Sequence, residues 1–162
     1  MTHPVAAVEL PRGTMLDRYR LPGGHVDCYV LEVPQPVSLA QFITAFYSST
    51  AFGPERWLLG ALLGKRATDR DIAELAAGQT TRFSAWSVEA RSADQILLCD
   101  YQGRTRSWLM VAPVPGGTRL HFGSAVVPAQ RQGERRLFRA LLWFHRWYSV
   151  QLLSGAASRL AR

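Results

Sequence analysis

Cysteines and long apolar runs are scarce in this sequence. The two cysteines, Cys28 and Cys99, are too few for a disulfide framework and lack the spacing of a metal site. No run of about 18 uncharged apolar residues occurs, so a transmembrane segment is not expected. The first residues also lack the basic start and apolar stretch of a secretory signal. These absences favour the reducing cytoplasm as the compartment.

Charged residues are also few, at 19%, against 48% hydrophobic residues. That balance excludes a disordered chain. The length of 162 residues fits one domain with a buried core. Residues 1–24 carry scattered proline and glycine, so we expect an irregular lead-in there and a single domain over 25–162.

Lysine is nearly absent, because 18 of the 19 basic residues are arginine, and the net charge is +7. Residues 82–162 hold twelve basic and four acidic groups. A coding bias for arginine would explain this excess, and so would recognition of an anion by guanidinium groups. Four arginines near the start of the last helix could bind acidic lipid heads or nucleic acid: Arg131, Arg135, Arg136 and Arg139. No nucleic-acid-binding motif accompanies them, so a nucleic-acid partner is not expected.

Apolar residues recur at helical spacing in some segments and alternate in others. The predicted helices are 39–49, 54–64, a short one between Thr68 and Gly78, and 134–160. The predicted strands are 25–33, 82–91, 95–101, 104–113 and 117–127. Short turns make the last four strands antiparallel neighbours. The class is therefore α+β: a curved antiparallel sheet of about five strands around a long C-terminal helix, with short helices after the first strand.

The turns between the last four strands predict which residues lie opposite each other. A two-residue loop after the first of them pairs Trp86 with Cys99. The next loop pairs Leu97 with Trp108. The final Pro-Gly-Gly turn pairs Trp108 with Ala125.

With these registers, most bulky side chains share one face of the sheet. This face carries Trp86, Val88, Leu97, Cys99, Tyr101, Arg104, Arg106, Trp108, Met110, His121 and Gly123. We expect it to be the concave face under the long helix, with Gly123 at a bend or bulge. An apolar patch on the other face would pack on the short helices or on a partner such as a second copy: Leu109, Val111, Leu120 and Phe122.

On that concave face, Arg106 and His121 would point into an aromatic interior. A buried charge needs a partner or an anion. A cavity with apolar walls and a few polar groups is the usual form of a small-molecule site. Alternatively, Arg106 lies at the rim of the sheet and reaches water.

Six short segments carry a family resemblance. They are His25-Val-Asp-Cys-Tyr29, Glu55-Arg-Trp57, Ala85-Trp-Ser-Val-Glu-Ala-Arg91, Ser107-Trp-Leu-Met-Val111, Thr118-Arg-Leu-His-Phe-Gly-Ser124 and His145-Arg-Trp-Tyr-Ser149. They resemble uncharacterised bacterial proteins of a domain-of-unknown-function family. That family is similar to the START, or Bet v 1-like, helix-grip superfamily (SRPBCC-like), which includes the polyketide cyclases.

The resemblance covers about residues 25–158. It implies a sheet that grips a long C-terminal helix, with a hydrophobic-ligand pocket between them. It implies no particular reaction. The five strands predicted here are fewer than the six or seven that are usual in the superfamily.

Candidate acid–base chemistry depends on His121 and His145, which could meet across such a pocket. Each could equally be a packed histidine with one hydrogen bond. Neither has an acidic neighbour in sequence that would complete a metal site. No nucleophile elbow or phosphate-binding loop is present, and no cofactor is expected. Cys99 on an apolar strand is expected to be a small core residue.

The leading hypothesis is that the protein binds an apolar or amphipathic small molecule, including one with an anionic head group. The expected apolar walls are Trp86, Trp108, Met110, Phe144 and Tyr148. Arg106, His121 and His145 would orient the polar end of the molecule. Two other hypotheses stay open. One is a cyclase or dehydratase in the same pocket, and the other is a protein-interaction module, such as a homodimer, without a true pocket.

Overall fold

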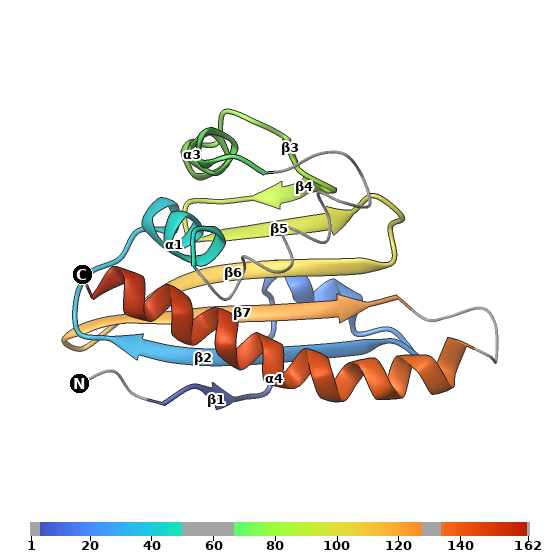
Figure 1. Ribbon diagram of the computed structural model, residues 1–162. Coiled ribbons are helices and arrows are strands. Elements are labelled where there is room, and N and C mark those ends of the chain that lie inside the picture. The colour runs from blue at the N-terminus through green and yellow to red at the C-terminus, as the bar shows by residue number, and fades with distance from the viewer. Residues whose placement is uncertain (1–3, 50–66, 128–133, 162) are drawn as a thin grey trace.

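The computed structural model of the chain describes residues 4–49, 67–127 and 134–161, with only the backbone described over 134–145. The helix predicted over 54–64 lies outside these residues. A seven-stranded sheet with order β1-β2-β7-β6-β5-β4-β3 occupies the centre of the fold (Figure 1). Every strand pair is antiparallel. The strands are β1 (Ala6–Ala7), β2 (His25–Val33), β3 (Arg82–Phe83), β4 (Trp86–Arg91), β5 (Gln95–Asp100), β6 (Thr105–Val114) and β7 (Gly117–Val126). The α+β class is confirmed, and the count of five strands is wrong.

Both extra strands are two residues long. β1 belongs to the predicted lead-in and pairs with β2 at the edge of the sheet. β3 results from a turn within the predicted strand 82–91. There Phe83 pairs with Trp86, and Ser84 between them has a φ of 53°. A positive φ is typical of a two-residue hairpin loop, so the chain reverses at a point where the sequence pattern predicts one continuous strand.

Three α-helices are described, and the sequence predicts all three: α1 (Leu39–Tyr47), α3 (Asp69–Ala77) and α4 (Glu134–Leu160). Ser38 and Gln41 form a capping box at the start of α1, and Thr68 and Asp71 form one at the start of α3. These reciprocal bonds satisfy backbone groups that would otherwise lack partners. Gly78 ends α3 in the left-handed conformation, with a φ of 72°.

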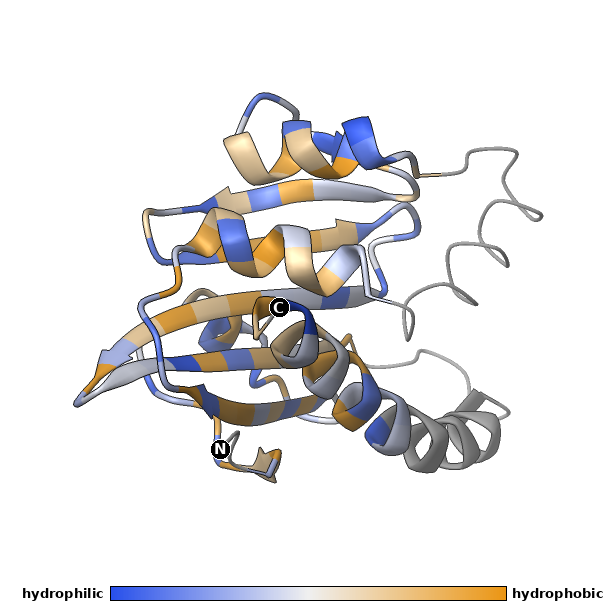
Figure 2. Cartoon of the chain, turned by 60° about the vertical axis from the view of Figure 1, so that its left-hand side comes forward, coloured by the Kyte–Doolittle hydropathy of each residue, from blue (hydrophilic) through white to orange (hydrophobic). Residues whose placement is uncertain are grey.

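The helices α1 and α4 lie on the same side of the sheet, with α4 running across β2 and β7 (Figure 1). The largest hydrophobic cluster lies between them and the sheet and includes Phe42, Phe46, Leu109, Leu120 and Phe122. The apolar patch predicted on this face is therefore covered by helices of the same chain. Figure 2 shows that hydrophobic and hydrophilic residues alternate along the strands, as expected when the two faces have different neighbours.

The opposite face of the sheet is covered by the N-terminal segment, including a short 3-10 helix, η1 (Met15–Tyr19). Leu16 and Trp108 are both 0% exposed and belong to a second core cluster. Gln95 Oε1 joins the two layers, because it accepts hydrogen bonds from Trp108 Nε1 and from the backbone N–H of Met15, each 3.0 Å long. The prediction that the face carrying Trp108 lies under the long helix is wrong.

Differences between the predicted and observed strand pairings explain part of the wrong assignment of residues to the two faces of the sheet. Leu97 pairs with Trp108 as predicted, but Trp86 pairs with Asp100 instead of Cys99. The pairing of β4 with β5 also shifts between Val88 and Ala90, where a bulge inserts an extra residue. As a result, Trp86 and Val88 pack against the cluster beneath the helices.

Gly123 has a different role from the predicted bend. It pairs in regular register with Cys28 and Trp108. A Cβ atom at this position would lie 2.8 Å from Leu16 Cδ2, 2.9 Å from Trp108 Cε3 and 2.8 Å from the Asp27 carbonyl oxygen. Glycine is required here because the N-terminal segment and Trp108 approach the backbone of β7 so closely.

Candidate functional site

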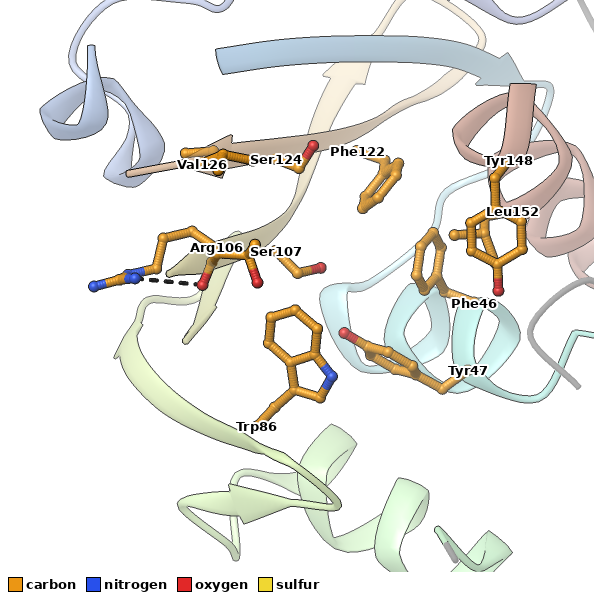
Figure 3. Close-up of a pocket in the computed structure, with 12 residues that line it drawn as sticks. Phe46, Tyr47, Trp86, Arg106, Ser107, Phe122, Ser124, Val126, Tyr148 and Leu152 are labelled. Carbon is orange, nitrogen blue, oxygen red and sulfur yellow. Dashed lines mark hydrogen bonds between the residues drawn. The ribbon is translucent and has the colours of Figure 1, made fainter. Parts of the chain in front are cut away.

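A cavity of about 220 Å³ lies between the sheet and the helices α1 and α4 (Figure 3). It is partly open to solvent. The lining residues are Phe46, Tyr47, Trp86, Thr105, Arg106, Ser107, Phe122, Ser124, Ala125, Val126, Tyr148 and Leu152. A dry cavity of about 150 Å³ can hold one benzene ring, so this space suits a molecule of one or two rings.

Aromatic side chains from four elements form most of the walls: Phe46 and Tyr47 of α1, Trp86 of β4, Phe122 of β7 and Tyr148 of α4. Their rings also support one another. Phe46 lies 4.9 Å from Phe122 and 5.2 Å from Tyr47, measured between ring centroids. Contacts of this kind fix the orientation of the rings before any ligand arrives.

The β3–β4 hairpin positions Trp86 at the cavity. Phe83, the cross-strand partner of Trp86, is buried, and the centroid of its ring lies 4.7 Å from that of Tyr47. Phe83 thereby holds the hairpin against the end of α1, and Trp86 lies beside it. The same turn that interrupts the predicted strand therefore shapes one wall of the cavity.

Two serines contribute to the polar surface of the cavity. Ser107 of β6 and Ser124 of β7 are directly opposite each other in the sheet. The Ser124 hydroxyl donates a 2.6 Å hydrogen bond to Asp27 Oδ1, and the backbone N–H of Ser124 donates to the same oxygen at 3.0 Å. Asp27 Oδ2 lies 3.5 Å from His25 Nε2, and only 10% of the Asp27 side chain is exposed.

Other polar atoms at the cavity are still available. Among the described residues, neither the Ser107 hydroxyl nor Trp86 Nε1 has a hydrogen-bond partner, and both residues are partly exposed. In Figure 3 the Ser107 side chain points between Trp86 and Phe122. The cavity therefore combines apolar walls with a few polar atoms that a ligand could engage.

Three of the predicted site residues line this cavity: Trp86, Arg106 and Tyr148. The Arg106 guanidinium, however, points away from the aromatic side chains (Figure 3). Its Nε donates a 2.7 Å hydrogen bond to Glu89 Oε2, and its carbon atom Cζ lies 4.5 Å from the centre of the Tyr19 ring. The expected anchor for a ligand is thus engaged on the other face of the sheet.

Trp108, Met110 and His121 are on that other face as well. The rings of Trp108 and His121 are 6.0 Å apart. Burial, and next the charge of Arg119, lower the pKa of His121, so its imidazole stays neutral at pH 7. Phe144 and His145 belong to α4, but their side chains lie outside the described residues.

Several cavity residues were not among the predicted site residues: Phe46, Tyr47, Ser107, Phe122, Ser124 and Leu152. Phe46 and Tyr47 belong to the apolar stripe of the predicted helix 39–49, and Phe122 belongs to the predicted apolar patch. The sequence gives no signal for the contact between Asp27 and Ser124, because they are 97 residues apart in the chain.

The cysteines are poor nucleophiles. Burial raises the pKa of the Cys28 thiol to about 12, and burial is also the largest cause of the raised pKa of Cys99. Since the thiolate is the reactive form, neither cysteine supports covalent chemistry at neutral pH. Within the part of the chain that the structure describes, no group of three or more histidine, cysteine or acidic residues could hold a metal ion.

No protein-family model matches the chain, and neither a curated protein nor a solved structure matches it significantly. None of the helices in the described ranges is long and apolar enough to cross a membrane. The functional argument therefore depends on the geometry of the cavity.

Proposed function

We propose that this protein binds a small apolar or amphipathic molecule in the cavity between the sheet and α4. The observation that carries the proposal is the cavity of about 220 Å³, partly open and walled by five aromatic side chains. A partly exposed aromatic cavity favours an apolar ligand, because ligand binding removes the apolar surface of the aromatic walls from water, which is favourable in free energy. The available polar atoms of Ser107 and Trp86 would orient that ligand.

We further propose that the fold is a variant of the helix grip. The long helix α4 across an antiparallel sheet supports this, as does the position of α1 directly after β2. The seven strands also agree with the size of sheet that the family resemblance implies. Two free cysteines support a reducing compartment such as the cytoplasm.

The enzyme hypothesis loses part of its argument. It assigned proton transfer to His121 or His145 and oxyanion stabilisation to Arg106, but His121 and the Arg106 guanidinium both lie on the face away from the cavity, and the side chain of His145 lies outside the described residues. The interaction hypothesis is weakened too, because α1 and α4 bury most of the apolar patch on which it depends. Ligand binding is therefore the function that we propose.

The test compares two variants that add the same side chain to opposite faces of the sheet. Ser107→Leu fills the cavity, whereas Ser87→Leu adds leucine at an exposed position of β4. Binding of 2-naphthol is measured by isothermal titration calorimetry. We expect Ser107→Leu to weaken binding by at least about tenfold, since roughly 1.4 kcal/mol of lost contact corresponds to that factor, and Ser87→Leu to bind like the wild type. Equal binding by all three proteins would show that the ligand occupies another site.

A further inference from the structure

Trp86 brings a hydrogen-bond donor to the cavity wall that is not used by the described part of the chain. Its indole lines the cavity, and no described residue accepts a hydrogen bond from its Nε1. This nitrogen is also not one of the buried polar atoms that lack a partner, so solvent reaches it. In Figure 3 it lies on the side of the indole that is turned toward Tyr47. An indole N–H can only donate, so only an acceptor can satisfy it.

The Ser107 hydroxyl is a second uncommitted group at the same part of the cavity. It has no side-chain partner within the described ranges, and it too is accessible to solvent. Its side chain points between Trp86 and Phe122 (Figure 3). A hydroxyl rotates to suit its partner, so Ser107 can add a second donor beside the first.

A ligand in the cavity would displace the water that these two groups use. A donor that is buried without an acceptor destabilises a complex by more than a typical hydrogen bond stabilises it. A hydrocarbon that covers Trp86 leaves the indole N–H in that state. A ligand that places an acceptor there satisfies the N–H and keeps the benefit of the apolar contacts.

We propose that Trp86 and Ser107 select ligands that carry an uncharged hydrogen-bond acceptor, namely a carbonyl group on an apolar or aromatic body. This inference rests on the proposed function and names its class of ligand. A carbonyl oxygen has two lone pairs, so it can accept from both side chains without adding a hydrogen that needs its own acceptor. The apolar body packs on Phe46 and Phe122, whose ring centroids are 4.9 Å apart.

The charge of the cavity wall favours a neutral ligand. Arg106 is the only charged residue among the described lining residues. Its Nε donates to Glu89 Oε2 and its Cζ is stacked on the Tyr19 ring, so the guanidinium points away from the cavity (Figure 3). An anion buried without a cation is strongly unfavourable. The neutral carbonyl therefore replaces the anionic head group expected from the sequence.

The experiment uses three probes with one ring and the same number of non-hydrogen atoms: acetophenone, α-methylstyrene and benzoate. The second replaces the ketone oxygen of the first by a CH₂ group, and the third carries a carboxylate. Dissociation constants are measured at pH 7 from the displacement of 2-naphthol in calorimetry. The readout is the affinity for acetophenone divided by that for α-methylstyrene, because hydration of the ketone affects this ratio equally in every variant. We expect benzoate to bind more weakly than acetophenone.

Trp86→Phe keeps an aromatic wall and removes the N–H. We expect it to lower the ratio by about two- to tenfold, the range for one net hydrogen bond. Trp147→Phe is the matched control, at a residue of α4 that is 56% exposed and does not line the cavity, and it should keep the wild-type ratio.

Ser107→Ala tests the second donor and should lower the ratio in the same direction. Its matched control is Ser87→Ala, at an exposed serine of β4. Circular dichroism confirms that each variant is folded, and Ser107→Ala carries the test alone if Trp86→Phe unfolds.

The two proposals fail differently. If 2-naphthol does not bind the wild type, the proposed function is wrong and the carbonyl selectivity is wrong with it. If 2-naphthol binds but the folded variants keep the wild-type ratio, the cavity binds ligands without recognising a carbonyl. Benzoate that binds as tightly as acetophenone, or acetophenone that does not displace 2-naphthol, would also overturn the selectivity while leaving the proposed function in place.

Discussion

The guanidinium carbon of Arg106 lies 4.5 Å from the centre of the Tyr19 ring, on the sheet face opposite the cavity. Glu89 completes this cluster. It accepts a 2.7 Å hydrogen bond from Arg106 Nε and another from the Tyr19 hydroxyl. Glu89 lies at the register shift of β4, between Val88 and Ala90. The bulge therefore presents a carboxylate that fastens the N-terminal segment to β6.

Removal of the Arg106 charge tests whether the residue is structural. Arg106→Met keeps the aliphatic length but loses the bond to Glu89 and the stacking on Tyr19. We expect the free energy of unfolding in urea to fall by about 1–2 kcal/mol, and 2-naphthol affinity to stay within about twofold of wild type. Arg82→Met, at an exposed position of β3, is the control and should change neither quantity. A loss of affinity without a loss of stability would instead make Arg106 a ligand anchor.

Substitution of Leu16 tests whether the N-terminal segment belongs to the core. It is 0% exposed and packs with Trp108 on the sheet. Leu16→Ala should lower the free energy of unfolding by about 2–5 kcal/mol, because it removes buried methyl groups and leaves a cavity. Leu21→Ala, at a position that is 44% exposed, should stay within about 0.5 kcal/mol of wild type. Similar small losses in both variants would mean that η1 is only loosely attached.

Substitution of Gly123 tests how closely the N-terminal segment and Trp108 approach the backbone of β7. An added methyl group would meet Leu16, Trp108 and the Asp27 carbonyl oxygen, each at less than 3.0 Å. We expect Gly123→Ala to destabilise the fold by about 1–3 kcal/mol, the usual cost of overpacking. Gly103→Ala meets no atom within 4 Å, so its cost comes from the backbone φ of 70° alone and should be about 1–2 kcal/mol. Chemical denaturation measures both. Because Gly123 does not have a positive φ, a Gly123→Ala variant as stable as the wild type would contradict the packing argument.

The helices and long strands could be predicted because their signals are local. The range 134–160 agrees with α4 at both ends, and 25–33 agrees with β2. Caps such as Ser38 and Thr68 belong to the same segments that they begin. The turn at Ser84 was missed because alternation continues on both sides of it and no glycine marks it.

The faces of the sheet could not be predicted in the same way. One register error of two residues, with Trp108 opposite Gly123 instead of Ala125, left the faces unchanged. The bulge in β4 moved Trp86 and Val88 to the other face. The remaining error came from treating residues 1–24 as a lead-in. Because this segment covers one face and the helices cover the other, large apolar residues occur on both, and bulk does not reveal which face carries the cavity.

His121, on the sheet face covered by the N-terminal segment, should make the free energy of unfolding depend on pH. Its folded pKa is lowered from 6.5, first by burial and next by Arg119. At pH 8 the imidazole is almost entirely neutral in both the folded and unfolded states, so stability does not depend on its titration there. As the pH falls below 6.5, the unfolded state binds a proton before the folded state does, and the free energy of unfolding decreases until the folded pKa is reached. Relative to His121→Gln, which does not titrate, the wild type should therefore lose stability between pH 6.5 and the lowered folded value.

Arg119 provides the second half of this test, because its charge contributes to the lowered pKa of His121. Arg119→Gln removes that charge, so the folded pKa should move back toward 6.5 and the loss of stability in acid should become smaller. Urea denaturation at pH 8, 7, 6 and 5 measures the effect in all three proteins. Part of the dependence should persist in Arg119→Gln, since burial is the larger cause. If the wild type and His121→Gln changed in parallel with pH, the imidazole would be as accessible to protons in the folded protein as in the unfolded chain, and its burial beside Trp108 would be wrong.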